Sequence, residues 1–377
     1  MFFDPKPVKA QNKIVLYGFA KDGKHKIWTG TIELNDDGTA HTVVRYGYVD
    51  GAMQEARKHV KKGKNIGKSN ETTVIEQAWF NLESMANKKR DEGYAENIND
   101  ANSVFLPMLA HSYNSHSHKV NFPAYIQPKL NGVRCLAEVI APGVVTYTSR
   151  KGKKFETLDS FSPAIISRVP VGTILDGEIY NHNLTLNQIV SRLKRVIGSR
   201  EDIQTDPVKF HIYDMAAPGV AWSERFQTLK EWFGDSEHFV HLVETELVNN
   251  AQEVKEFHAQ KIEEGYEGSM IRAAGGFYEP NSRSYNLMKN KDFLEAEFEI
   301  VGGYEGEGKE EGQVIFKCKT AEGSEFSVRP KGSAEVRKAW FEDLENIVGK
   351  QLSVRFQEWT EYKVPFHARG LAIRDYE

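Results

Sequence analysis

The sequence predicts an α+β protein made of several domains, and three observations support this fold class. The chain has 377 residues, which is longer than one ordinary small domain and favours two or three. Short runs that alternate apolar and polar residues, typical of strands, occur in every part of the chain, with a few helical stretches between them. The content of 40% hydrophobic and 27% charged residues is that of a globular protein.

Residues 1–117 are predicted to form a small domain with one sheet and one helix. The strand-like runs, separated by turns that contain Asp and Gly, are residues 13–19, 26–34 and 41–49. The helix is expected over residues 70–94, with Asn70 or Thr72 as its cap and Gly93 at its end.

The histidine-rich stretch at residues 110–120 is predicted to be a linker to the next domain. His111, His116 and His118 could suggest a metal site. They have neither a companion Cys nor the spacing of ligands on one helix, so a linker fits better than a metal site.

Residues 118–291 alternate strands with helices, which predicts a larger domain. The expected strands are residues 124–130, 133–140, 144–150, 173–180, 209–216 and 267–273. The expected helices are residues 186–197, 223–233 and 250–265. Asn131–Gly132 is a strong turn signal, so the first of these strands should end near Lys129 and reverse tightly.

Residues 292–377 are strand-rich and are predicted to form a small barrel. Strands are expected over residues 297–306, 312–330 and 351–359, and the second of these ranges contains a hairpin. One helix, over residues 333–348, lies between them. Five or so short strands with one interposed helix fit a barrel of the OB type.

Charge and targeting signals limit the class of protein. No apolar run is long enough for a membrane span and no secretory signal core is present, so an intracellular, cytoplasmic protein with no membrane partner is expected. Cys135 and Cys318 are too few for a disulfide framework and are expected to be buried. The formal net charge is −4, but local basic clusters favour a polyanionic partner. These clusters are residues 57–68, 149–154 and 191–200.

Lys129 is the candidate nucleophile, because carboxylates and lysines elsewhere in the chain complete a plausible site. Glu178 lies on a strand two residues from Asp176, which is more simply a hydrogen-bonding residue at a strand end. Glu267 begins a strand, and residues 289–291 (KNK) place two lysines on one strand face. Carboxylate oxygens suit Mg²⁺ and ammonium groups neutralise phosphate oxygens, so the set predicts a nucleoside triphosphate site.

The chain resembles the ATP-dependent DNA ligases, a family of covalent nucleotidyltransferases. Their motifs run K-x-D-G-x-R, S-R, D-G-E, aromatic-Asp, E-G-x-M-x-R, K-x-K and a last motif with Arg. This sequence has, in that order, KLNGVR (129–134), SR (149–150), DGE (176–178), YD (213–214), EGSMIR (267–272), KNK (289–291) and IRD (373–375). Each motif alone is weak, but seven in order are specific. The resemblance implies a nucleotidyltransferase core with an ATP-grasp-like mixed sheet, followed by an OB-fold domain.

The resemblance also implies roles for individual residues. Lys129 would attack the α-phosphate of ATP and hold AMP as a phosphoramidate. The ATP-binding residues would be Gln127, Arg134, Glu178, Tyr213, Lys289, Lys291 and Arg374. In this set Tyr213 would stack on adenine and Arg374 would orient the pyrophosphate. Glu178 would bind the ribose or support the metal site. Glu267 and Glu178 would hold Mg²⁺, for which Mn²⁺ could substitute, and Arg150 and Arg283 would contact the 5′-phosphate of the nick.

Three positions depart from the family pattern. Asn131 stands where the family usually has Asp, and it keeps one carbonyl acceptor but loses the charge. Tyr213 stands where the family usually has Phe, a mild change because the ring is kept. The chain ends IRDYE, without the lysine that commonly follows the Asp of the last motif, which weakens the assignment of Arg374.

Residues 1–117 resemble a WGR domain, a small module associated with DNA-end binding. The similarity rests on RYGYVDG (residues 45–51), in which Tyr46 replaces the usual Trp. The alternative is an unrelated protein-binding or solubilising domain. In either case the basic cluster should contact DNA phosphates, through Arg57, Lys58, Lys61 and Lys62.

The function implied by the resemblance is sealing of nicks in double-stranded DNA by an ATP-dependent ligase, acting as a monomer. The compact form suggests a viral enzyme. The alternatives are an RNA ligase, an mRNA capping guanylyltransferase that uses GTP, or a DNA-binding module with a decayed nucleotide site. Lys129, Glu178 and Glu267, all intact, argue against decay.

Overall fold

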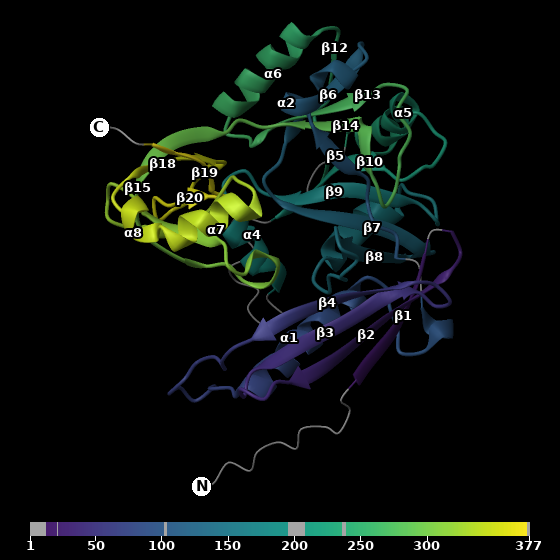
Figure 1. Cartoon of the computed structure of the whole chain (residues 1–377). Coiled ribbons are helices and arrows are strands. Elements are labelled where there is room, and N and C mark those ends of the chain that lie inside the picture. Colours follow the sequence, from purple (N-terminus) through teal and green to yellow (C-terminus); the bar gives the residue numbers. More distant parts are fainter. Residues whose placement is uncertain (1–12, 21, 102–103, 195–207, 236–238, 375–377) are drawn as a thin grey trace. The chain divides into compact units, whose positions relative to one another are not determined.

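The computed structural model describes residues 13–20, 22–101, 104–194, 208–235 and 239–374. It is a mixed α+β structure, which confirms the α+β part of the predicted fold class (Figure 1). Two compact units make up the chain. The first comprises Met1–Thr31, Arg45–Gln54 and Asn81–Lys291, and the second comprises Ile32–Val44, Glu55–Phe80 and Asp292–Glu377.

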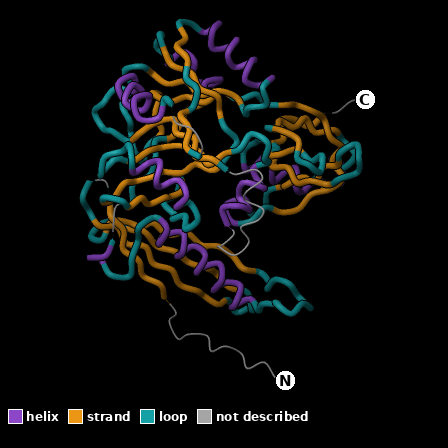
Figure 2. The backbone as a smooth tube through the Cα atoms, turned by 180° about the vertical axis from the view of Figure 1, so that it is seen from behind, coloured by secondary structure: helices purple, strands orange, loops and turns teal. Residues whose placement is uncertain are grey.

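The N-terminal segment forms a sheet and a helix, as predicted, but the sheet has four strands and only three were predicted. The strands lie in the order β1 (Lys13–Phe19), β2 (His25–Leu34), β3 (Ala40–Tyr48) and β4 (Met53–Val60). Helix α1 (Val74–Asp91) covers one face of the sheet, where Ala78 packs on Ala40 and Val60 (Figure 2). Strand β4 was not predicted, because its residues are mostly polar and lack an apolar alternation.

Helix α1 starts later than predicted and has a different cap. The Thr73 hydroxyl accepts from the backbone N–H of Glu76, and the Glu76 carboxylate accepts from the backbone N–H of Thr73. This reciprocal pair is a capping box, so neither Asn70 nor Thr72 caps the helix. Gly93 follows the helix at φ +87°, a left-handed conformation that suits glycine and ends a helix as predicted.

The middle of the chain forms two five-stranded sheets. One has the order β11-β10-β9-β7-β8, and the other has the order β12-β6-β13-β14-β5. The strands of the first are β7 (Val133–Ala141), β8 (Val144–Ser149), β9 (Ile174–Tyr180), β10 (Lys209–Met215) and β11 (Val240–Leu242). Those of the second are β5 (Leu109–Ser112), β6 (Ala124–Lys129), β12 (Glu246–Val248), β13 (Gly268–Ala273) and β14 (Arg283–Asn290).

Helices accompany these sheets. They are α2 (Tyr113–His116), α3 (Ser162–Ile166), α4 (Leu186–Lys194), α5 (Trp222–Phe233) and α6 (Ala251–Glu263), with 3-10 turns at Ile98–Asp100, Ser117–Lys119 and Asp159–Phe161. The predicted helices correspond to α4, α5 and α6, although the end of the first, residues 195–197, lies outside the described residues. Most of the predicted linker at residues 110–120 is instead structured. Its strand β5 pairs in parallel with β14, a partner too distant in sequence to be foreseen.

The turn after Lys129 differs from the prediction. Strands β6 and β7 belong to different sheets, so Asn131 and Gly132 carry the chain across from one sheet to the other and do not close a hairpin. A Cβ on Gly132 would lie 2.4 Å from the carbonyl oxygen of Ile179, so only glycine allows this close crossing. Nothing in the structure explains the choice of Asn131.

The last part of the chain forms a closed barrel with the order β15-β16-β17-β21-β18. The strands are β15 (Leu294–Glu305), β16 (Val314–Lys319), β17 (Glu325–Pro330), β18 (Gln351–Phe356) and β21 (Arg369–Arg374). A small ladder, β19 (Glu358–Trp359) and β20 (Pro365–Phe366), a 3-10 turn at Gly308–Glu310, and helices α7 (Ala334–Glu342) and α8 (Leu344–Ile347) complete this part. Both cysteines are buried, as predicted, Cys318 in the barrel core. Across the described residues no helix is long and apolar enough to cross a membrane.

Gly177, between Asp176 and Glu178, is expected to tolerate no side chain. A Cβ there would lie 2.5 Å from the carbonyl oxygen of His211 on β10. We expect Gly177→Ala to force β9 and β10 apart and lower stability by about 1–3 kcal/mol, measured by urea unfolding. Gly275→Ala, where the added methyl would meet nothing within 4 Å, is the control. Equal stability of the two variants would contradict the prediction.

Candidate active site

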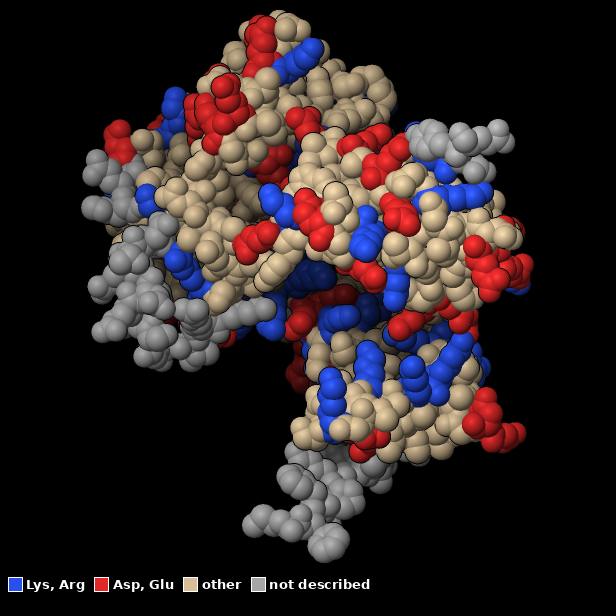
Figure 3. Space-filling view, turned by 90° about the vertical axis from the view of Figure 1, so that its left-hand side faces the viewer, with Lys and Arg blue, Asp and Glu red and all other residues tan. Residues whose placement is uncertain are grey.

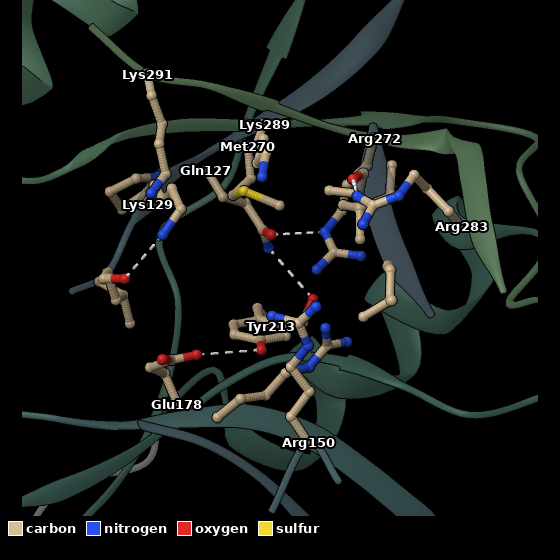
Figure 4. Close-up of a pocket in the computed structure, with 16 residues that line it drawn as sticks. Gln127, Lys129, Arg150, Glu178, Tyr213, Met270, Arg272, Arg283, Lys289 and Lys291 are labelled. Atoms are coloured by element: carbon tan, nitrogen blue, oxygen red, sulfur yellow. Dashed lines mark hydrogen bonds between the residues drawn. The ribbon is translucent and has the colours of Figure 1, made fainter. Parts of the chain in front are cut away.

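A cavity of about 240 Å³ is lined by residues of both five-stranded sheets (Figure 4). Most of the residues predicted from sequence meet there, and they are Gln127, Lys129, Arg134, Arg150, Glu178, Tyr213, Arg283, Lys289 and Lys291. The rest of the lining is Leu109, Ala110, Pro128, Leu130, Met270, Arg272 and Leu287. Figure 4 shows Lys129 and Lys291 together at one end, and Arg283 at the other.

Strand periodicity places the side chains of the β12-β6-β13-β14-β5 sheet in the cavity. Gln127 and Lys129 are two residues apart on β6, so they share a face. Met270 on β13 is paired with Gln127 on one side and with Lys289 of β14 on the other. Residues directly opposite in a ladder point to the same face, so Gln127, Met270 and Lys289 form a row on the cavity side of this sheet.

Lys129 and Lys291 share one carboxylate. The Lys129 Nζ donates to Glu267 Oε2, and the Lys291 Nζ donates to Glu267 Oε1. Glu267 precedes β13, and its side chain is 8% exposed. Burial alone would raise the pKa of Glu267, but the charges and hydrogen bonds of Lys129 and Lys291 hold it below its usual value. The carboxylate is therefore ionised and holds both ammonium groups in the same place.

The pKa of Glu178 is shifted in the opposite direction to that of Glu267. Burial raises its pKa to about 7, although the charges of Lys129 and Arg134 oppose this shift. The Tyr213 hydroxyl lies 3.3 Å from Glu178 Oε2. Burial, followed by the charge of Lys291 and of other nearby cations, lowers the pKa of Lys289. The cavity is thus short of negative charge, which suits an anionic ligand.

Arg134 is held by Asp176, which the sequence did not assign to the site. The guanidinium donates from Nε and Nη2 to the two oxygens of Asp176, at 2.9 and 2.6 Å. The Tyr278 hydroxyl donates to Asp176 Oδ2 at 2.7 Å. Such a bidentate pair fixes the plane of the arginine. Asp176 therefore fixes the orientation of Arg134, in agreement with the prediction that Asp176 is a hydrogen-bonding residue.

A second buried carboxylate, Asp214, organises the opposite wall and was missed. It accepts from Arg225 Nε at 2.8 Å and from Arg272 Nη1 at 2.6 Å. Arg272 also donates from Nε to Gln127 Oε1 at 2.6 Å. Asp214 and Arg272 end two of the recognised motifs, so motif membership was a usable signal. Arg225 lies on α5, outside all of the recognised motifs, so no motif indicated its role.

Some predicted site residues do not line the cavity. Arg374 ends β21 in the barrel, where its Nε donates to Ser353 Oγ at 2.8 Å. Asp375, in the same motif, lies outside the described residues. Arg57 is paired with Glu33 and with Glu55.

The other residues of the basic cluster are on the surface. Lys58 and Lys61 each have a carboxylate near their Nζ, at 3.5 and 3.3 Å, and Lys62 is exposed. Figure 3 shows Lys and Arg side chains gathered on the N-terminal sheet-and-helix segment, in the lower part of the view. Surface pairs of this kind are weak and exchange readily with other charges.

The histidines of residues 110–120 lie together. His111 stacks on Tyr285 with ring centroids 4.0 Å apart, and His116 meets His111 edge-on at 5.2 Å. Within the described ranges, no three His, Cys, Asp or Glu side chains are grouped as metal ligands. A metal at the cavity would therefore need oxygens from another molecule, such as phosphate oxygens, to complete its shell.

Comparisons with known proteins agree on one family. The model of the ATP-dependent DNA ligase domain matches residues 107–291. The chain is 30% identical over 368 residues to a DNA ligase of African swine fever virus, covering 90% of this chain and 85% of that protein. It is 26% identical over 247 residues to a DNA ligase of enterobacteria phage T4, covering 52% of this chain and 50% of that protein.

Solved structures show the same fold at lower identity. A Lig E DNA ligase structure is similar at a TM-score of 0.59 with 21% identity, covering 71% of this chain and 99% of that one. A structure named Pmar-Lig_Pre is similar at a TM-score of 0.65 with 21% identity, covering 81% of this chain and 75% of that one.

Proposed function

We propose that this chain, which belongs to the ATP-dependent DNA ligase family, seals nicks between a 5′-phosphate and a 3′-hydroxyl in duplex DNA. One observation carries the proposal beyond family membership. A lysine amine, Lys129 Nζ, borders a cavity whose other cations include Arg150, Arg283, Lys289 and Lys291, which could hold a triphosphate. A nucleophile held among phosphate-binding groups is what transfer of a nucleotidyl group to the enzyme requires.

The reaction would proceed in three displacements at phosphorus. Lys129 Nζ forms a bond to the α-phosphorus of ATP, and pyrophosphate leaves with the electrons of the broken P–O bond. The 5′-phosphate of the nick then attacks the same phosphorus and releases the lysine. Finally the 3′-hydroxyl attacks the 5′-phosphorus, loses its proton and releases AMP. Arg150 and Arg283 would bind the anionic 5′-phosphate during the last two steps.

The lysine must be neutral to attack. The Lys129 Nζ donates to Glu267, and the cations Lys289 and Lys291 line the same cavity as Lys129. The carboxylates of Glu267 and Glu178 fit Mg²⁺, which takes one or two carboxylates together with phosphate oxygens and, when bound, would neutralise charge on the triphosphate. Lys291 remains as a second partner for Glu267 when Lys129 gives up its proton.

Covalent labelling tests this proposal. The purified protein is incubated with Mg²⁺ and ATP or GTP labelled at the α-phosphate, and then denatured. Label from ATP, followed by release of AMP and joining when nicked DNA is added, is the expected result. Label from GTP alone would indicate a capping guanylyltransferase, and joining of nicked RNA alone would indicate an RNA ligase. No label from either, after release of any pre-bound AMP with pyrophosphate, would leave a DNA-binding module.

The pKa of Glu178 gives this labelling a pH dependence. Its carboxylate must be ionised to bind the ribose or a cation, and its pKa is raised to about 7. We therefore expect kcat/KM for self-adenylation to rise as the pH increases through about 7, because the charged form accumulates above the pKa. In Glu178→Gln the rate should be low, and the change of slope near pH 7 that comes from Glu178 should be absent. A wild-type profile that is flat from pH 6 to 8 would contradict the assignment.

We propose three domains, residues 1–117, 118–291 and 292–377, of which the last is an OB-fold domain. In this arrangement Arg374 on β21 would orient the departing pyrophosphate when the last domain closes over the nucleotide. The enzyme would act as a monomer inside the cell.

The first domain, WGR-like or otherwise, would bind DNA. We expect the full chain with Lys58, Lys61 and Lys62 changed to Ala to adenylate itself normally but to bind nicked DNA more weakly. The slope of log affinity against log salt should fall by about one unit for each lost phosphate contact. Binding is measured by fluorescence anisotropy, with Lys338→Ala on the barrel surface as the control. Unchanged affinity and slope would remove the DNA-binding role of this cluster.

A further inference from the structure

A register shift aims the Tyr213 side chain into the cavity. On β10, Ile212 pairs with Gly177 of β9 and Asp214 pairs with Asp176, so Tyr213 is the extra residue between them. Where one strand has an extra residue, two successive side chains can point to the same face. Tyr213 therefore reaches the cavity while its neighbour Asp214 binds Arg272 on the same side.

The Tyr213 ring is held independently of its hydroxyl. The guanidinium carbon of Arg272 lies 5.3 Å from the ring centroid, and that of Arg134 lies 5.9 Å from it. Each arginine is in turn fixed by a buried carboxylate, Asp214 or Asp176. These cation–π contacts act on the ring, so a phenylalanine would keep them.

The hydroxyl has one specific partner. It lies 3.3 Å from Glu178 Oε2, and among the described residues it is the one hydrogen-bond donor to that carboxylate. The separation exceeds the usual 2.5–3.0 Å, as is frequent before a ligand binds. Glu178 is thus a partly buried carboxylate, and its donor is a hydroxyl on a ring that Arg272 and Arg134 hold in place (Figure 4).

We propose that the Tyr213 hydroxyl is a positioning group that sets the orientation of the Glu178 carboxylate toward the ribose of the bound nucleotide, and so determines selection of ribonucleotides. The proposal rests on the proposed function, in which Glu178 contacts the ribose. Without the hydroxyl, Glu178 keeps its through-space attraction to Lys129 and Arg134 but loses the contact that fixes its direction.

Tyr213→Phe tests the proposal, because it removes one oxygen and keeps the ring. We expect KM for ATP in self-adenylation to rise about tenfold with little change in kcat, the scale of one hydrogen bond to a charged group. The preference for ATP over 2′-deoxy-ATP or 3′-deoxy-ATP should fall by a similar factor.

Two controls make the result decisive. Tyr147→Phe removes another buried hydroxyl, 3.0 Å from Ser162 Oγ and outside the cavity, and should change none of these values. Glu178→Gln should itself lose the ribose preference, and adding Tyr213→Phe to it should cause no further loss. Independent, multiplicative losses, or a Tyr213→Phe enzyme with the wild-type KM for ATP and the wild-type ribose preference, would overturn the proposal. A wild-type protein that takes no label at all would instead refute the proposed function.

Discussion

Replacing Lys129 with alanine is expected to reduce self-adenylation by about 10⁴-fold or more, the scale of losing the nucleophile in an enzyme that forms a covalent intermediate. Lys129→Arg is the more informative variant. It keeps a positive charge that can pair with Glu267, but a guanidinium does not become a neutral nucleophile near pH 7. Both variants should therefore fail to take up label from ATP.

The control for these variants is Lys119→Ala, a lysine that does not line the cavity. It should adenylate itself at the wild-type rate. The DNA affinity of Lys129→Arg should also remain close to that of the wild type, since Lys129 is not one of the proposed DNA contacts. Label retained by Lys129→Arg would mean that another side chain is the nucleophile and that Lys129 serves Glu267 only as a structural partner.

Asp214→Ala should produce the largest loss of stability. Asp214 is fully buried and neutralises two arginines, Arg225 and Arg272, whose side chains are 1% and 2% exposed. Removing one member of a buried ionic group leaves uncompensated charge and costs about 3–5 kcal/mol. The free energy of unfolding in urea measures this loss. Asp159→Ala, at an exposed position, should change it by less than about 0.5 kcal/mol.

The same change should also reduce adenylation, because Arg272 holds Gln127 and lies over the Tyr213 ring. If Asp214→Ala were as stable as the wild type, Arg225 and Arg272 would have to find other acceptors. The organising role of Asp214 would then be wrong.

The parts of the site that could be predicted are those that depend on short-range rules. Period-two alternation places Gln127 and Lys129 on one face of a strand, whatever the rest of the fold does. The order of the motifs identified Glu178 and Tyr213, and both line the cavity. The roles of these residues remain predictions, which the experiments above test.

The parts that could not be predicted depend on contacts between distant segments. Arg225 reaches Asp214 only because α5 packs beside β10, and no local pattern in the helix indicates that direction. The stretch at residues 110–120 is short and polar and was predicted to be a linker. Its strand exists because β14, far along the chain, provides the pairing edge.

The prediction of a hairpin after Lys129 was wrong for a related reason. Asn131 and Gly132 match a hairpin signal, yet local sequence cannot specify whether the next strand joins the same sheet. The two strands on either side join different sheets, and Gly132 is required by its close approach to the Ile179 carbonyl. The glycine was a correct signal of special backbone geometry but not of the kind of turn.

The central claim is that Lys129 carries the nucleotide, and mapping the adduct tests it most directly. The wild-type protein is labelled with α-labelled ATP and Mg²⁺ and digested under alkaline conditions, because phosphoramidates are labile in acid. The labelled peptide is then sequenced by mass spectrometry. AMP on the Nζ of Lys129 is the expected result. AMP on another residue, with Lys129 unmodified, would contradict it.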